Sequence, residues 1–138
     1  MAITTTMTNS YKQDILSGTQ TSADTYKLAL YTSTATLDAS TTVYSATNEV
    51  VGTGYTAGGA TLSGFTVTLS GSTACLTFNN PAFTSSTITA RGCLIYNFTQ
   101  GNKSVAAYDF GADITSTNGT FTVNFPVAVA ATALIRIA

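Results

Sequence analysis

The chain has 138 residues and no histidine; only 8% of its residues are charged, and the net charge is −1. A typical soluble domain is about 25% charged, so most of the side chains that transfer protons or bind phosphate are missing. This composition argues against nucleic-acid binding, which needs a basic patch, and against catalysis by a Ser–His or Cys–His pair. The length predicts one domain, 1–138, and no run of about 18 apolar residues predicts a membrane span.

The first ten residues, 1–10, carry no charge and lack the basic and apolar regions of a secretory signal. We expect this segment to be an N-terminal arm that becomes ordered on a partner. Deletion of Met1 to Thr6 would then weaken assembly and leave thermal stability nearly unchanged.

A short helix is predicted directly after the arm. Residues 8–10 are all good N-cap residues, Tyr11 and Ile15 share one face at i,i+4, and Gly18 can end the helix in a left-handed conformation. A helix this short needs tertiary contacts to persist.

Apolar residues alternate with threonine and other small polar residues through most of the remaining chain, which predicts half-buried strands. The predicted strands are 26–32, 65–70, 74–79, 87–97, 104–110, 121–125 and 134–137, and turn signals lie at 70–72, 79–81, 100–102 and 118–119. The Asn118–Gly119 pair, flanked by Ile114 and Phe121, predicts a tight hairpin turn. The pattern favours an all-β fold, a single-domain β-sandwich or jelly roll of about seven or eight antiparallel strands.

The segment 37–59 fits neither period. Loops of this length are usually functional or disordered, but Val43, Val50 and Tyr55 make this one too apolar for a disordered linker. We expect a long ordered excursion that packs on its own domain or on a neighbour.

Few residues are candidates for chemistry, and the sequence predicts no catalytic residue, metal site or cofactor. Asp109 and Asp113 are the closest pair of acids in a predicted loop. Capping of turns by accepting backbone N–H groups is the favoured interpretation; a calcium ion or carboxylate-driven glycan hydrolysis are the alternatives. Cys75 and Cys93 are interpreted as two buried thiols, with a disulfide between neighbouring strands as the alternative.

Arg91 and Arg136 each lie within an otherwise apolar strand. Each arginine is interpreted either as exposed on a solvated sheet face or as part of an ion pair across a subunit interface, with Glu49 and Asp109 as the first acids to consider. Tyrosine, with an apolar ring and a polar tip, is also common at interfaces. The candidate interface residues are Tyr44, Glu49, Tyr55, Arg91 and Arg136.

Six short stretches along the chain carry a family resemblance: 9–12 (NSYK), 15–18 (ILSG), 27–31 (KLALY), 48–59 (NEVVGTGYTAGG), 89–96 (TARGCLIY) and 125–126 (FP). With these stretches the chain resembles a family of small tailed-phage virion structural proteins, and 48–59 is the most specific of them. Some members look like cement or decoration proteins on the capsid exterior.

The resemblance implies a cement protein that binds the outer surface of the major capsid protein shell and stabilises it against the pressure of packaged DNA. Such a protein is made in the host bacterial cytoplasm, resides on the virion, assembles as a homodimer or homotrimer, and has no nucleic-acid or membrane partner. A tail or fibre-associated protein that adsorbs to a host surface is the alternative.

Overall fold

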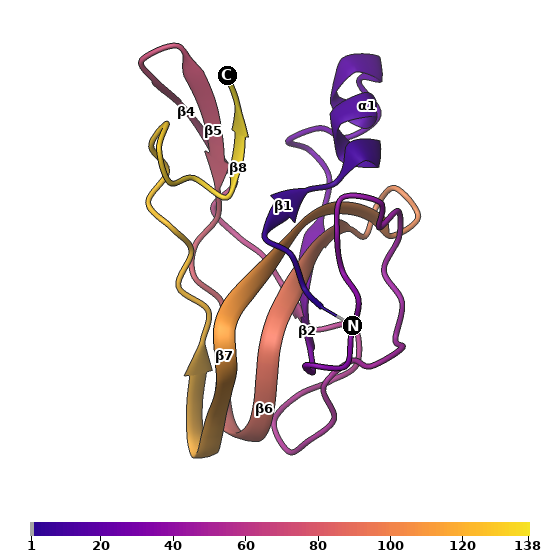
Figure 1. The fold of residues 1–138 in the computed structure, drawn as a ribbon, viewed down its shortest axis with the longest axis vertical. Coiled ribbons are helices and arrows are strands. Elements are labelled where there is room, and N and C mark those ends of the chain that lie inside the picture. The colour runs from indigo at the N-terminus through magenta and orange to yellow at the C-terminus, as the bar shows by residue number, and fades with distance from the viewer. Residues whose placement is uncertain (1) are drawn as a thin grey trace.

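The structure is a computed structural model that describes residues 2–138 (Figure 1). It is mostly β, with 47% strand and 7% helix. The elements in chain order are β1 (Thr6–Met7), α1 (Asn9–Ser17), β2 (Tyr26–Tyr31), β3 (Ala60–Thr61), β4 (Thr66–Ser70), β5 (Thr73–Thr77), β6 (Ala82–Asn97), β7 (Lys103–Thr122) and β8 (Ile135–Ile137). They form a five-stranded sheet, β1-β7-β6-β2-β3, and a three-stranded sheet, β4-β5-β8, both antiparallel. The all-β prediction is confirmed.

The long β6–β7 hairpin and β2 form the centre of the large sheet. Alternate residues of β2 point to opposite faces, and both faces are buried: Leu28 and Leu30 lie in one apolar cluster, Ala29 and Tyr31 in another. Burial on both faces makes β2 the most enclosed strand of the molecule.

The prediction of a tight hairpin turn at 118–119 is wrong, because these residues lie inside a strand. Asn118 does adopt a positive φ of 50°, but it lies inside β7, and pairing with β6 continues beyond it to Thr122. Ser85, next to the Ser86 that pairs with Gly119, also has a positive φ of 49°, so both strands bend in the same stretch. The ribbon folds back here (Figure 1), and the predicted strand 121–125 overlaps the end of β7.

The helix prediction is confirmed. Thr8 is the N-cap, and its Oγ1 accepts a hydrogen bond from the Tyr11 N–H; Gly18 ends the helix with φ 74°.

The structure corrects the expectation for the arm 1–10, of which residues 2–10 are described and Met1 lies outside the described residues. Ile3 is buried against Leu37, Thr6 and Met7 pair with β7, and the last two residues begin α1. The low charge of the segment suggested a free arm, but Ile3 and Met7 anchor it. Deletion of Met1 to Thr6, which removes the buried Ile3, is therefore expected to reduce thermal stability.

The excursion 37–59 is ordered and packs on its own domain. Leu37 and Tyr44 contact one face of the large sheet, whereas Val50 and Tyr55 belong to the cluster on the other face. The segment thus wraps around the β2 side of the sheet.

The small sheet and α1 stand beside each other at one end of the molecule (Figure 1). On one face of the small sheet Thr73 and Cys75 are buried, and Ala130 of the loop between β7 and β8 donates its N–H to Ser70 Oγ. The other face carries Val67 and Leu69 and is turned toward the helix. This arrangement creates the site described next.

Candidate functional site

Tyr44, Glu49 and Tyr55, three of the predicted interface residues, meet inside the molecule. Glu49 is 7% exposed. One carboxylate oxygen accepts from Tyr44 Oη at 2.6 Å, and the other accepts from Tyr55 Oη and from the Gly58 N–H at 2.8 Å. Burial, followed by the hydrogen bond to Glu49, raises the pKa of Tyr55. The cluster holds the excursion together, and its charge is satisfied by neutral donors.

The excursion is fixed to the sheet beside this cluster. The ring of Tyr44 stacks on that of Tyr96 with centroids 4.7 Å apart, and Tyr96 Oη donates to the Gly58 carbonyl at 2.6 Å. Gly59, with φ 80°, approaches β2 so closely that a Cβ would overlap the Leu28 carbonyl oxygen. These contacts give the most distinctive sequence stretch, 48–59, a structural role within its own chain.

Arg91 pairs with Asp109, one of the two acids that the sequence suggested, but within one chain. Arg91 Nε lies 2.9 Å from Asp109 Oδ1, and the same oxygen accepts the Gly111 N–H. The bond from Gly111, together with Arg91, holds the pKa of Asp109 below its usual value. The loop and turn expected around Asp109 and Asp113 are wrong, because both acids lie inside β7. Asp109 accepts the N–H of Gly111 (φ 87°) where the pairing with β6 is irregular, and Asp113 is exposed.

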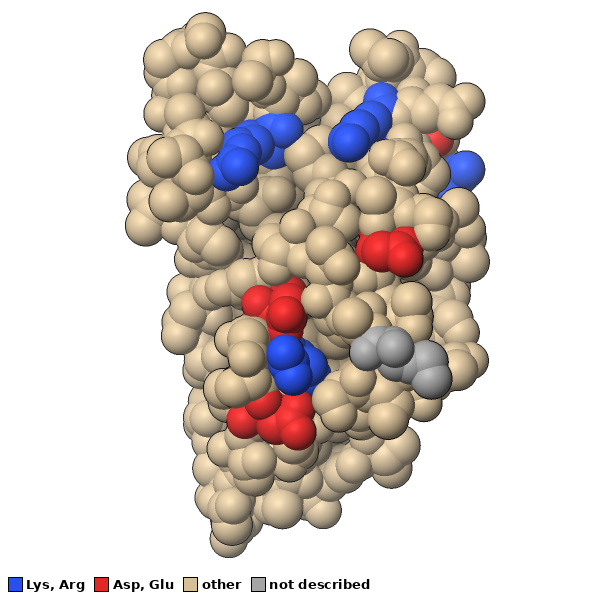
Figure 2. All heavy atoms as spheres, in the orientation of Figure 1, with Lys and Arg blue, Asp and Glu red and all other residues tan. Residues whose placement is uncertain are grey.

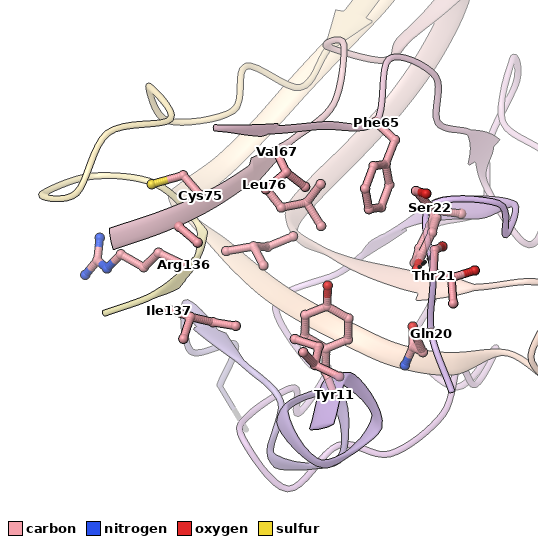
Figure 3. Close-up of a pocket in the computed structure, with 14 residues that line it drawn as sticks. Tyr11, Gln20, Thr21, Ser22, Phe65, Val67, Cys75, Leu76, Arg136 and Ile137 are labelled. Atoms are coloured by element: carbon pink, nitrogen blue, oxygen red, sulfur yellow. Dashed lines mark hydrogen bonds between the residues drawn. The ribbon is translucent and has the colours of Figure 1, made fainter. Parts of the chain in front are cut away.

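Arg136, the remaining candidate, lies at the edge of an apolar groove between α1 and the small sheet. It pairs with Cys75 in the sheet, and its side chain points away from the groove interior (Figure 3). The inner part of the groove has a volume of about 320 Å³. Figure 3 shows Tyr11 pointing into it from the helix, opposite Phe65, Val67 and Leu76 from the sheet.

Toward its mouth the groove continues between the helix and the end of β8. The residues that line this part are Met7, Lys12, Ile15, Leu16, Arg136 and Ile137. A further hollow, lined by Thr5, Thr6, Met7, Lys12, Pro126, Thr132, Ala133, Leu134 and Arg136, adjoins it. We call these three connected parts the groove. Figure 2 shows the notch, with basic side chains on both sides and no acidic side chain between them.

Sequence reasoning placed Val67 and Leu69 on the core side of a half-buried strand. The structure leaves them 60% and 74% exposed, on the face that borders the groove. Their alternation was correctly recognised; the missing information was the position of α1, which stands off from this face. The one local signal in the sequence was Leu16, an apolar residue next to Ile15 that lies outside the face shared by Tyr11 and Ile15. In the structure Leu16 is exposed.

The described residues 2–138 contain no group of three or more His, Cys, Asp or Glu side chains placed to hold a metal ion. Cys75 and Cys93 are buried free thiols in different sheets, and burial raises the pKa of Cys93. The interpretation as buried thiols is confirmed. Within residues 2–138, no helix has the length and apolar character needed to cross a membrane.

Comparisons with protein-family models, curated protein sequences and solved structures found no match to this chain. The functional proposal is therefore based on the residues, their geometry and the family resemblance of the short stretches.

Proposed function

We propose that this chain is a phage capsid cement protein that binds the outer surface of the major capsid protein shell and stabilises it against internal DNA pressure. The family resemblance supports the class of protein. The proposal includes no enzymatic step and no cofactor, and it takes the protein to act on the virion as a homodimer or homotrimer.

One observation carries the proposal: large apolar side chains stand out on a surface with very little charge. Leu16, Val51, Leu69 and Val127 are 91%, 93%, 74% and 70% exposed, respectively. Full burial of one such side chain contributes about 1.5–3 kcal/mol. A surface of this kind gains free energy when it is covered, which suits a protein that acts by binding.

Shell stabilisation would follow from mass action. A protein that binds the assembled shell and not its separated subunits lowers the free energy of the assembled state at every occupied site. Linking two or three copies increases the effective affinity through a higher local concentration.

We further propose that the two sheets represent a reduced β-sandwich or jelly roll. The contribution of Leu76 from β5 and Ile135 from β8 to the main apolar cluster supports this assignment, since the small sheet joins the core at that end. An experimental structure of the assembled protein would test whether the sheets close over one another there.

The decisive experiment adds the purified protein to shells assembled without it from the major capsid protein of the same phage. We expect saturable co-sedimentation and a higher temperature of shell disassembly. The double variant Leu16→Ser, Leu69→Ser tests the role of the exposed apolar side chains: it should fold as the unaltered protein does but bind the shell less tightly. Absence of binding by the unaltered protein would refute the proposal.

Copy number separates cement from a tail or fibre-associated protein. Quantitative mass spectrometry of virions should find hundreds of copies for cement, against a few to dozens for a tail part. The lower number would favour adsorption to a host surface instead.

A further inference from the structure

We propose that the groove between α1 and the β4-β5-β8 sheet binds a segment of a partner protein that combines apolar side chains with a carboxylate. The inference rests on the proposed function only in assigning this segment to a virion protein. Three properties of the groove define the chemistry of the segment.

The first property is the apolar lining. Phe65 and Val67 face Tyr11 across the inner part (Figure 3), and Ile15 and Ile137 line the part nearer the mouth. Packed secondary-structure elements normally interdigitate without large voids. Here about 320 Å³ remains between the two walls, within the usual range for ligand pockets of about 300–1,000 Å³. Apolar side chains of an incoming segment would fill this space.

The second property is an unmatched positive charge. Lys12 lies at the rim of the groove on the helix side and Arg136 at the rim on the sheet side, where both line the adjoining hollow. The Arg136 side chain points away from the apolar lining (Figure 3), and no acidic residue lines any part of the groove. Arg136 Nη1 donates a hydrogen bond to the Ala133 carbonyl. Neither Arg136 nor Lys12 forms an ion pair with a carboxylate among residues 2–138, where the one ion pair is Arg91–Asp109. Two cations next to apolar walls complement a carboxylate and repel a basic partner.

The third property is an unsatisfied acceptor. Gln20 is 8% exposed and lines the inner part of the groove. Its Nε2 donates to Asp14 Oδ2 and to the Ser104 carbonyl, whereas its Oε1 has no hydrogen-bond partner among the described residues. Buried polar atoms are rarely left unpaired. Because Oε1 is enclosed, a backbone N–H of a peptide segment would supply the missing donor once the Gln20 side chain turns toward the groove.

A second copy of this chain is a poorer match for the groove. Most of its acids already accept hydrogen bonds within the chain, namely Asp14, Asp24, Asp38, Glu49 and Asp109. Of the six acids in a second copy, Asp113 alone would be free to pair with both Lys12 and Arg136. The charge pattern therefore favours a different, acidic protein.

The test measures peptide binding to the full chain by isothermal titration calorimetry. The probe is a short acetylated, amidated peptide in which leucine alternates with glutamate; matched peptides carry lysine for glutamate or serine for leucine. We expect the glutamate peptide to bind at least about tenfold more tightly than either matched peptide, and to weaken as salt rises.

Two substitutions locate the site. Arg136→Gln should weaken binding of the glutamate peptide about three- to tenfold, and Ile137→Ser should weaken it by a similar factor. Lys103→Gln and Ile114→Ser are the matched controls, since Lys103 lies outside the groove and Ile114 is 44% exposed compared with 48% for Ile137. Both controls should bind as the unaltered protein does.

Equal binding of the lysine peptide, no binding at millimolar concentration, or insensitivity to both groove substitutions would overturn the inference. A concentration-dependent dimer in sedimentation velocity that Ile137→Ser abolishes and the glutamate peptide does not displace would overturn it in favour of a second copy. Peptide binding without shell binding would refute the proposed function but support the groove as a binding site. Shell binding without peptide binding would refute the groove proposal alone.

Discussion

Glu49 is a buried residue with a specific structural role, whereas the sequence predicted an exposed interface position for it. The sequence grouped it with Tyr44 and Tyr55 as interface candidates, and the three do meet, but their hydroxyl and carboxylate groups bond to one another within the chain. Sequence spacing showed that they are close, because they lie within one short segment. It did not show that Glu49 is turned inward.

Replacing Glu49 with glutamine should lower the free energy of unfolding by about 1–3 kcal/mol. The new amide nitrogen would face a group that donates a hydrogen bond, which leaves one buried donor unpaired. Tyr44→Phe, which removes one donor and adds no opposing one, should cost less, about 1 kcal/mol. Urea denaturation measures both. If Glu49→Gln kept full stability but lost shell binding, the interface role predicted from the sequence would be restored.

Two glycines with positive φ offer a matched comparison. Gly71→Ala meets no atom within 4 Å, so it should cost only the left-handed strain of about 1–2 kcal/mol. Gly59→Ala adds the overlap with the Leu28 carbonyl and should cost at least about 3 kcal/mol. Thermal denaturation of the two variants checks this difference, and equal losses would show that β2 can move aside.

At the scale of the elements, the fold-back of the β6–β7 ribbon depends on one buried hydroxyl. Ser86 Oγ lies 3.0 Å from the Phe83 carbonyl, 2.8 Å from Ser116 Oγ and 3.0 Å from the Gly119 carbonyl. It thereby connects polar groups of both strands where the ladder is interrupted.

Ser86→Ala should reduce stability by about 1–3 kcal/mol, because these buried groups lose a partner. Thr89→Ala, which removes an exposed hydroxyl bonded to Thr115, should change stability by less than about 0.5 kcal/mol. Chemical denaturation would distinguish the two. A similar small effect for both would mean that water replaces the serine hydroxyl in the fold-back.

Local signals predicted the elements well. The helix between Thr8 and Gly18 is set by its caps, and β4 and β5 are set by alternation, so a short window of sequence contains the required information. The fold-back at Asn118 and the groove beside Val67 depend on which segments pair or pack across the molecule. No window around either residue contains that information.

For the whole molecule, the absence of histidine and the burial of the tyrosines predict the pH dependence of stability. Burial raises the pKa of all seven tyrosines, that of Tyr11 to about 12. Unfolded tyrosines ionise near pH 10. Their contribution is therefore fully present below about pH 10 and is lost as the pH rises through the folded-state values.

We expect nearly constant stability between about pH 6 and 9, and a fall above about pH 10. Urea midpoints at neutral and alkaline pH measure this change, and tyrosinate absorbance reports the ionisation itself. Tyrosinate that forms near pH 10 in the folded protein would contradict the prediction.

The order of strands in the large sheet has a consequence for synthesis. β2 pairs with β6 along its whole length but with β3 only at Lys27 and Leu28, and β1 pairs with β7. On the ribosome, β2 therefore emerges long before the strand that covers its edge, and contacts so distant in sequence form slowly. A nascent chain that stops before β6 would display an unpaired apolar strand, so its yield in cells should depend on translation rate and chaperones.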